Sequence, residues 1–151
     1  MNTLKRILLV EDNGKDRELA LAALGENNLA NEVVVARDGV EALDYLYRRG
    51  SYSDYPLGNP AVVLLDLKMP RMDGLDVLKH MKSEERFKMI PIVMLTASRE
   101  ERDLVESYRG GVNAYMVKPI DFDQFVAAVK QIGLFWAVLN EPPPGTWSRP
   151  I

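Results

Sequence analysis

Apolar residues gather in short runs along the chain, and each run ends abruptly at a polar residue. The runs cover residues 7–10, 33–36, 62–65, 92–95 and 114–117. They are rich in β-branched side chains and are apolar at nearly every position rather than at alternate ones. Such runs are typical of strands buried on both faces, as in a parallel sheet. The pattern therefore predicts five short, buried strands.

Between these runs, apolar residues recur at the three- and four-residue spacing of an amphipathic helix. The sequence predicts five helices. The first follows Asn13, the second follows Asp38-Gly39, and the third carries the apolar stripe Leu75, Leu78 and Met81. The fourth runs from about Ser98 to Ser107, and the fifth begins near Asp121. Alternating strands and helices imply parallel pairing with right-handed crossovers. We therefore expect an α/β fold, a doubly wound five-stranded parallel sheet with helices on both faces.

Length and composition narrow the classes of protein that this chain can be. Its 151 residues provide for one domain, with an ordinary globular balance of 47% hydrophobic and 27% charged residues. Nineteen basic and 22 acidic residues give a net charge of -3, which argues against nucleic-acid binding driven by bulk charge. The absence of cysteine excludes a disulfide scaffold, a thiol nucleophile and cysteine-ligated metals, and it suits a reducing cytoplasm.

Membrane insertion and paired-histidine chemistry are also disfavoured. No apolar run approaches the ~18 residues of a membrane span, and the N-terminus does not resemble a signal peptide. The single histidine, His80, rules out a site with two imidazoles, and we expect it to be a solvated helix residue. The sequence thus predicts a cytoplasmic protein that binds neither nucleic acid nor membrane.

Acidic, hydroxyl or amine side chains follow four of the five predicted strands, at the point where each strand ends. They are Glu11 and Asp12 after the first, Asp66 after the third, Thr96 after the fourth and Lys118 after the fifth. In a doubly wound sheet, ligands bind beyond the carboxyl ends of the strands. Crowded carboxylates repel one another unless a cation lies between them, and Mg²⁺ is the hard cation that oxygen ligands prefer. The arrangement suits phosphoryl transfer with a carboxylate as nucleophile.

Each of these residues also has an ordinary structural explanation. An acid after a strand is commonly a turn residue or a helix cap. In the same way, Thr96 can cap the following helix, and Lys118-Pro119 can be an exposed turn. Their joint placement at one rim favours a shared site over several separate explanations.

Four motifs in order resemble the receiver domain of two-component response regulators. They are Val10-Glu11-Asp12-Asn13, Leu65-Asp66-Leu67-Lys68-Met69-Pro70-Arg71-Met72-Asp73-Gly74, Leu95-Thr96-Ala97-Ser98 and Val117-Lys118-Pro119. The resemblance covers residues 4 to 132 and implies a flavodoxin-like five-stranded sheet, in agreement with the pattern of apolar runs. It also implies a signalling protein rather than an enzyme, one that catalyses only its own phosphorylation and dephosphorylation.

The resemblance implies a role for each acid at the rim. Asp66 would accept a phosphoryl group from a phosphohistidine on a partner sensor histidine kinase. Asp12 and Asp66 would bind Mg²⁺ directly, whereas Glu11 would act through a water molecule. The main-chain carbonyl of Lys68 would be a further ligand of the metal.

The resemblance also implies how phosphorylation would be sensed. Lys118 would pair with the phosphoryl group, and its bond to Pro119 is expected to be cis. Thr96 would turn toward the phosphoryl oxygens, and Tyr115 would be an aromatic switch that moves between exposed and buried rotamers. The alternative for Tyr115 is a half-buried strand tyrosine with no switching role. The face made by the fourth helix, fifth strand and fifth helix would change on phosphorylation.

The chain continues past the receiver motifs with an unusually apolar segment. We expect residues 1–132 to form the receiver domain and residues 133–151 to extend its last helix and end in a proline-rich tail. Phe135, Trp136 and Leu139 lie in a stretch that is apolar on nearly every side, which predicts a homodimer interface. The alternative is that the segment folds back over its own domain. This ending and the long loop at 48–60 resemble stand-alone regulators paired with phytochrome-type kinases.

Two other functions remain open at this point. A constitutive dimeric interaction module, not controlled by phosphorylation, would not need the intact set of acids, threonine and lysine. A metal-dependent phosphatase or hydrolase would need a further acid or base group or a cap domain, which the motifs do not supply. A DNA-binding output is disfavoured, because residues 133–151 are too few for a helix-turn-helix.

Overall fold

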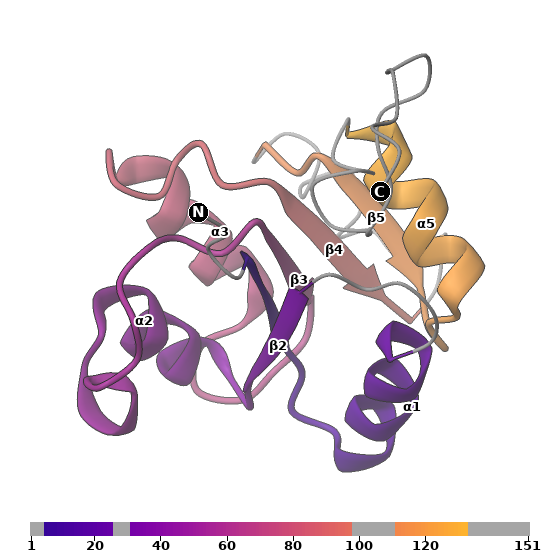
Figure 1. Ribbon diagram of the computed structural model, residues 1–151, viewed down its shortest axis with the longest axis horizontal. Helices are drawn as coiled ribbons and strands as arrows, with labels where there is room; N and C mark the ends of the chain where they lie inside the picture. Colours follow the sequence, from indigo (N-terminus) through magenta and orange to yellow (C-terminus); the bar gives the residue numbers. More distant parts are fainter. Residues whose placement is uncertain (1–4, 26–30, 98–110, 133–151) are drawn as a thin grey trace, which may run out of the picture.

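A five-stranded sheet with helices on both faces forms the fold, in a computed structural model that describes residues 5–25, 31–97 and 111–132 (Figure 1). The strands are β1 (Lys5–Val10), β2 (Asn31–Ala36), β3 (Val62–Asp66), β4 (Ile92–Thr96) and β5 (Ala114–Val117). The helices are α1 (Gly14–Leu24), α2 (Gly39–Tyr47), α3 (Gly74–Ser83) and α5 (Phe122–Gln131), and η1 (Gly50–Tyr52) is a 3-10 turn. The five predicted strands and the doubly wound α/β class are confirmed.

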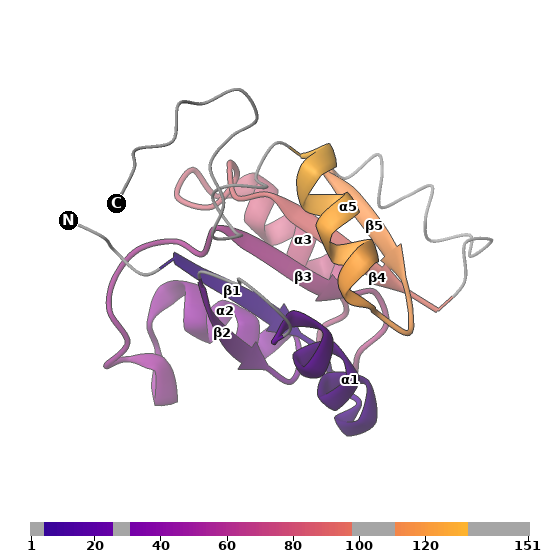
Figure 2. The same ribbon diagram turned by 45° about the vertical axis from the view of Figure 1, so that its right-hand side comes forward.

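The strand order is β2-β1-β3-β4-β5, and every neighbouring pair is parallel. Val10 of β1 lies opposite Leu65 of β3, and Asp66 lies opposite Leu95 of β4. The order therefore brings the carboxyl ends of β1, β3 and β4 together at one edge, as the side-by-side strands in Figure 2 show. Between β1 and β3 the chain order reverses direction, which is where doubly wound sheets bind ligands.

Among the described helices, one pair covers each face of the sheet. α1 and α5 pack around Leu9, Leu64 and Phe125, whereas α2 and α3 pack on the opposite face around Leu8 and Leu65 (Figures 1 and 2). Successive side chains of a strand point to opposite faces, so each short run supplies both core layers at once. This is why the runs are apolar throughout instead of alternating.

All four described helices begin at a side chain that caps the first turn. Asn13, Asp38, Asp73 and Asp121 each accept a hydrogen bond from the backbone N–H three residues further on, at 2.8–2.9 Å. Such caps satisfy backbone N–H groups that the first helical turn leaves without a partner. The predicted helix starts at Asn13, Asp38 and Asp121 are confirmed, and the caps fix where each helix leaves the rim of the sheet.

Two glycines let the loop after β3 pass close to its neighbours. A Cβ atom at Gly74 would lie 2.3 Å from the carbonyl oxygen of Asp66, and one at Gly39 would lie 2.4 Å from that of Met72. The Gly74 N–H also donates to the carbonyl of Leu67 at 2.9 Å. The start of α3 is therefore held against the end of β3, at the residue that the sequence singles out as the nucleophile.

The long loop between α2 and β3 is organised by one arginine and three tyrosines. Arg48 has a left-handed φ of 55° and donates to the carbonyl of Pro56 from Nε at 3.1 Å and from Nη2 at 2.8 Å. The rings of Tyr45, Tyr52 and Tyr55 meet edge to face, with centroids 5.5–5.8 Å apart. The loop therefore contains the turn η1 and packs its aromatic rings against Tyr45 of α2.

His80 is not the solvated residue that the sequence predicted. It is half-buried, with Nε2 2.8 Å from the hydroxyl of Tyr47 and the two rings edge to face. The prediction was wrong because α2 and α3 pack against each other, which places Tyr47 beside a residue far along the chain.

Some predictions concern residues outside the described ranges. They are the fourth helix at about 98–107 and the extension at 133–151 with Phe135, Trp136 and Leu139. These stay predictions. Among residues 5–25, 31–97 and 111–132, no helix combines the length and apolar character that crossing a membrane requires.

Replacing Gly74 with alanine should destabilise the protein, because the new methyl group would lie 2.3 Å from the Asp66 carbonyl oxygen. Relieving that overlap requires α3 to move away from β3, at a cost on the order of 1–3 kcal/mol. Gly14→Ala is the matched control, since a Cβ there has its nearest neighbour, the Arg17 side chain, at 3.5 Å. Urea unfolding measures both variants, and equal free energies of unfolding would contradict the close approach.

Candidate functional site

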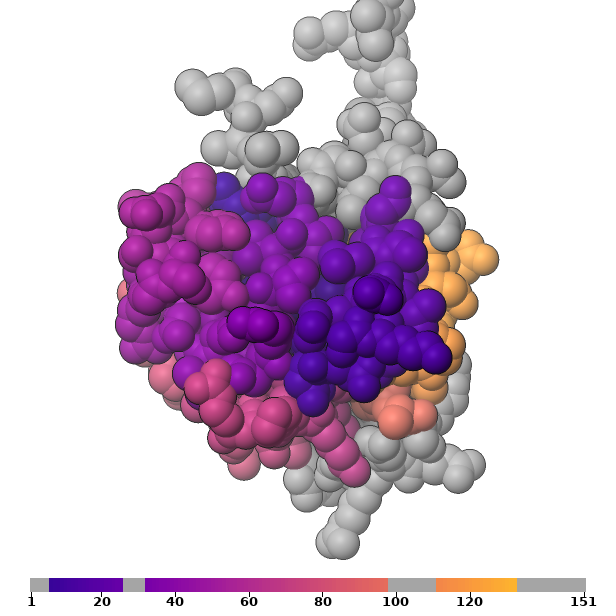
Figure 3. All heavy atoms as spheres, turned by 90° about the horizontal axis from the view of Figure 1, so that it is seen from below, coloured from indigo at the N-terminus to yellow at the C-terminus, as the bar shows by residue number. Residues whose placement is uncertain are grey.

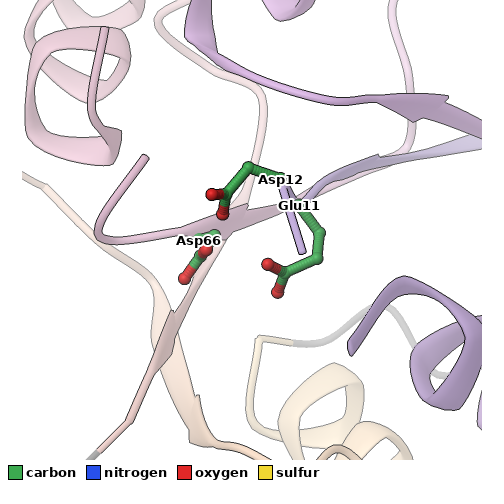
Figure 4. A group of neighbouring side chains, drawn as sticks. All are labelled: Glu11, Asp12 and Asp66. Carbon is green, nitrogen blue, oxygen red and sulfur yellow. The ribbon is translucent and has the colours of Figure 1, made fainter. Parts of the chain in front are cut away.

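Three carboxylates meet at the carboxyl edge of the sheet. Glu11 and Asp12 directly follow β1, and Asp66 is the last residue of the adjacent strand β3. One oxygen atom from each of the three lies within 4.8 Å of the others, and Figure 4 shows the side chains gathering from the two strand ends. Glu11 and Asp66 are buried, whereas Asp12 is exposed. The cluster predicted from the sequence is therefore assembled.

Lys118 brings a positive charge into this cluster from the end of β5, the strand at one edge of the sheet. It follows β5, and its Nζ lies 3.0 Å from Glu11 Oε1 and 3.0 Å from Asp66 Oδ1. Its backbone N–H donates to the carbonyl of Thr96 at 2.8 Å, and its peptide bond to Pro119 is cis, as expected. One ammonium group thus bridges acids that come from two different strands.

Burial and the crowding of acids shift the protonation of Asp66. Burial, and next the nearby Glu11 carboxylate, raise the pKa of Asp66 to about 8, although Lys118 opposes the shift. Burial alone would lower the pKa of Lys118, but its pairing with Glu11 and Asp66 raises it above its ordinary value. Because the folded-state pKa of Asp66 is raised, its contribution to stability is greatest at acidic pH and is lost as the pH rises through about 8.

Backbone contacts hold the turn after β1 in place. Glu11 Oε2 accepts from the N–H of Asn13 at 3.2 Å. Arg17 on α1 donates from Nη1 to the carbonyls of Glu11 at 3.1 Å and Asp12 at 3.0 Å. The first turn of α1 therefore fixes the backbone of both acids from outside.

A pocket of about 220 Å³ opens over the cluster. It is lined by Asp12, Asn13, Asp16, Asp66, Leu67, Lys68, Ala97 and Lys118. Seen from below in Figure 3, segments from the first quarter of the chain and from around residues 60–80 lie next to one another on a continuous surface. Lys68 is exposed at the edge of the pocket, where the sequence predicted that its main-chain carbonyl would be a ligand.

The donor set of the pocket fits a hard divalent cation. All the clustered side-chain donors are carboxylate oxygens, which is the preference of Mg²⁺. Within the described part of the chain, Glu11 Oε1 is buried and lacks a well-directed hydrogen bond, its close contact being the ion pair with Lys118. A nearby cation or bridging water would compensate that buried charge.

Thr96, which directly precedes the pocket residue Ala97, and Tyr115 lie on the same face of the sheet. Thr96 is completely buried, and its hydroxyl donates a long hydrogen bond of 3.5 Å to the carbonyl of Met116. Tyr115 is half-buried against the core layer of α2 and α3, opposite Met94 on β4. Since Met94 and Thr96 are two positions apart on one strand, Thr96 and Tyr115 share a face.

Two charged contacts near the rim were not predicted from the sequence. Asp16, in the first turn of α1, has Oδ2 3.3 Å from Lys118 Nζ. Asp38, noted only as a helix start, accepts from Nε of Arg71 in the β3–α3 loop at 2.8 Å. Burial alone would raise the pKa of Asp38, but the N–H of Glu41 and then Arg71 hold it below the ordinary value. The available signal was an acid at or just after a helix start next to the rim: Asp38 is the N-cap of α2, and Asp16 lies in the first turn of α1.

The model of the response regulator receiver domain matches residues 7–130 of this chain. The response regulator Rcp1 from Synechocystis sp. is 37% identical over 135 residues, which are 89% of this chain and 90% of that protein. The solved structure of the Mn(2+)-bound form of Rcp1 has a TM-score of 0.71, with 37% identity over 87% of this chain and 94% of that chain. The matched residues 7–130 include the three clustered acids, Thr96 and Lys118.

Other similar structures come from phytochrome signalling. The bacteriophytochrome response regulator AtBRR is 61% identical with a TM-score of 0.84, over 93% of this chain and 100% of that chain. RtBRR, also a bacteriophytochrome response regulator, is 59% identical with a TM-score of 0.83, over 95% and 86% of the two chains. The phosphorylated cyanobacterial phytochrome response regulator RcpA is 41% identical with a TM-score of 0.73, over 89% and 95%. The chain belongs to the response regulator receiver family of signalling proteins and is related to the phytochrome response regulators.

Proposed function

We propose that this protein is a cytoplasmic response regulator that accepts a phosphoryl group on Asp66 from a sensor histidine kinase of the phytochrome type. The observation that carries the proposal is the position of Lys118 Nζ, 3.0 Å from both Asp66 Oδ1 and the buried Glu11 Oε1. An ammonium group at this point can neutralise a phosphoryl group on Asp66 without leaving its present place. The pocket over the cluster, about 220 Å³, leaves room for such a group.

Asp66 is the nucleophile of the proposed transfer. One of its carboxylate oxygens attacks the phosphorus of the kinase phosphohistidine, so that a P–O bond forms while the P–N bond breaks. The imidazole nitrogen departs with the electron pair and takes up a proton. Lys118 stabilises the charge on the phosphoryl oxygens during this step. Water later hydrolyses the acyl phosphate and regenerates the carboxylate.

Mg²⁺ is the proposed cofactor of the site. Asp12 and Asp66 would hold it directly, Glu11 through a water molecule, and Lys68 through its main-chain carbonyl. When bound, the ion supplies positive charge that keeps Asp66 ionised and that stabilises the phosphoryl oxygens. Support comes from the all-carboxylate donor set in this chain and from the Mn(2+)-bound form in which the relative Rcp1 was solved.

Thr96 and Tyr115 are the proposed route from the pocket to the surface. The long hydrogen bond of Thr96 to the Met116 carbonyl, at 3.5 Å, is weak enough to exchange for a phosphoryl oxygen. Movement of Thr96 would vacate space on the face that it shares with Tyr115, and Tyr115 would follow. We propose that this changes the surface formed by the predicted fourth helix, β5 and α5.

The proposed domain division is a receiver at residues 1–132 and an extension at 133–151, through which two copies associate. Support comes from the apolar character of Phe135, Trp136 and Leu139 in the sequence. The complete set of acids, threonine and lysine at the rim favours control by phosphorylation over a constitutive interaction module.

Asp66→Asn should abolish phosphorylation, because the amide removes the nucleophilic oxygen while keeping the shape of the side chain. The measurement is Mg²⁺-dependent incorporation of labelled phosphate from a cognate kinase or from a small phosphodonor. Asp54→Asn is the matched control, since Asp54 is exposed on the loop before β3 and lies outside the pocket. Full labelling of Asp66→Asn would show that another residue is the acceptor.

A double substitution, Phe135→Glu with Trp136→Glu, should convert a dimer into a monomer, because two carboxylates would have to be buried in an apolar contact. Light scattering after size exclusion measures the mass of the full-length chain, with and without a phosphoryl mimic. The control is Leu57→Glu, which alters an apolar side chain that is 85% exposed in the loop before β3. A wild-type chain that is monomeric in both conditions would refute the proposed association.

A further inference from the structure

Asp16 is a third carboxylate on the ammonium group of Lys118. It lies in the first turn of α1, and its Oδ2 is 3.3 Å from Lys118 Nζ. Its side chain is 35% exposed, whereas that of Glu11 is 1% and that of Asp66 is 4% exposed. Glu11 and Asp66 thus hold Lys118 from inside the protein, and Asp16 contacts it from the solvent side.

We propose that Asp16 is a positioning residue that acts through Lys118 and weakens the hold of the site on a phosphoryl group at Asp66. This inference rests on the proposed phosphorylation of Asp66. It assigns to Asp16 an influence on the stability of the phosphorylated state relative to the unphosphorylated one. Asp16 would therefore differ from the metal-binding and phosphoryl-binding residues, because it would favour the unphosphorylated state.

Competition for Lys118 is the first reason. Lys118 Nζ forms ion pairs with three carboxylates, at 3.0, 3.0 and 3.3 Å, and its contact with Asp16 Oδ2 is also a hydrogen bond. A phosphoryl group on Asp66 adds acceptor oxygens that must displace one of these partners. Asp16 is the partner on the open side of the pocket, so the phosphoryl oxygens compete with it first.

Repulsion is the second reason. A phosphoryl group brings about −1.5 to −2 charges into the pocket. The Asp16 carboxylate lines that same pocket and carries charge of the same sign. Glu11 already fixes Lys118 from the buried side, at 3.0 Å, so Asp16 is not needed to keep the ammonium group in the pocket.

The effect of Asp16 on a cation has the opposite sign. Asp16 lies outside the group of carboxylates whose oxygens meet within 4.8 Å, so it is not one of the clustered ligands. Its negative charge at the pocket wall nevertheless attracts a divalent cation. Removing this charge should therefore weaken the binding of Mg²⁺ while strengthening that of a phosphoryl group.

The structural role of Asp16 can be separated from this effect. The contact that caps α1 uses its backbone, since Asp16 N–H donates to Asn13 Oδ1 at 2.9 Å. Asp16→Asn keeps the backbone and the side-chain shape, and it removes only the charge. Glu18→Gln is the matched control, because it neutralises an exposed acid of the same helix that lies outside the pocket.

Titration calorimetry tests the inference with Mg²⁺ alone and then with beryllofluoride at saturating Mg²⁺. Asp16→Asn should bind beryllofluoride about two- to fivefold more tightly, the range of a partly exposed ion pair, and Mg²⁺ less tightly than the wild type. Glu18→Gln should match the wild type for both probes, and Asp16→Glu should return both affinities toward it.

Two outcomes would overturn the inference alone. In the first, Asp16→Asn binds beryllofluoride with the same affinity as the wild type. In the second, Asp16→Asn binds both probes more weakly, as it would if the substitution had damaged the pocket. Failure of the wild type itself to bind beryllofluoride would instead overturn the proposed phosphorylation, and the role of Asp16 with it.

Discussion

The ammonium group of Lys118 ties together acids from separate elements, and the geometry of the rim depends on it. Glu11 follows β1, Asp66 ends β3 and Asp16 lies on α1, yet all three have an oxygen within 3.3 Å of Lys118 Nζ. One positive charge does not balance these acids together with Asp12. The site is therefore held in shape and at the same time left with excess negative charge, which favours a cation in the pocket.

The fold supplies this contact through short strands and close approaches. Parallel order places the ends of β1 and β3 side by side, and capped helices turn away directly after the rim. Gly74 lets α3 press against the carbonyl of Asp66, and Arg17 holds the backbone of Glu11 and Asp12. Thr96 and Tyr115 share one face of the neighbouring strands, along the proposed route from the pocket to the surface.

The strands of the sheet and the residues at their ends could be predicted, because the local pattern of apolar and polar residues encodes them. Runs apolar at nearly every position specify buried parallel strands, and parallel strands bring the residues at their ends together, so Asp66 and Lys118 were predictable neighbours. The Asp16–Lys118 and Tyr47–His80 contacts could not be predicted. Each joins segments that are far apart in the chain, and each depends on how those segments pack and on how far the side chains extend. Such contacts leave no periodic signal in the sequence.

Thermal unfolding with and without Mg²⁺ tests most directly whether excess negative charge at the rim defines the site. The wild-type midpoint should rise by roughly 5–10 °C at a hundredfold excess over the dissociation constant. Asp12→Asn should unfold at a higher temperature than the wild type without Mg²⁺, since one repelling charge is gone, and should gain little from the ion. A wild-type midpoint that ignores Mg²⁺, or an Asp12→Asn variant that responds as strongly as the wild type, would contradict this view.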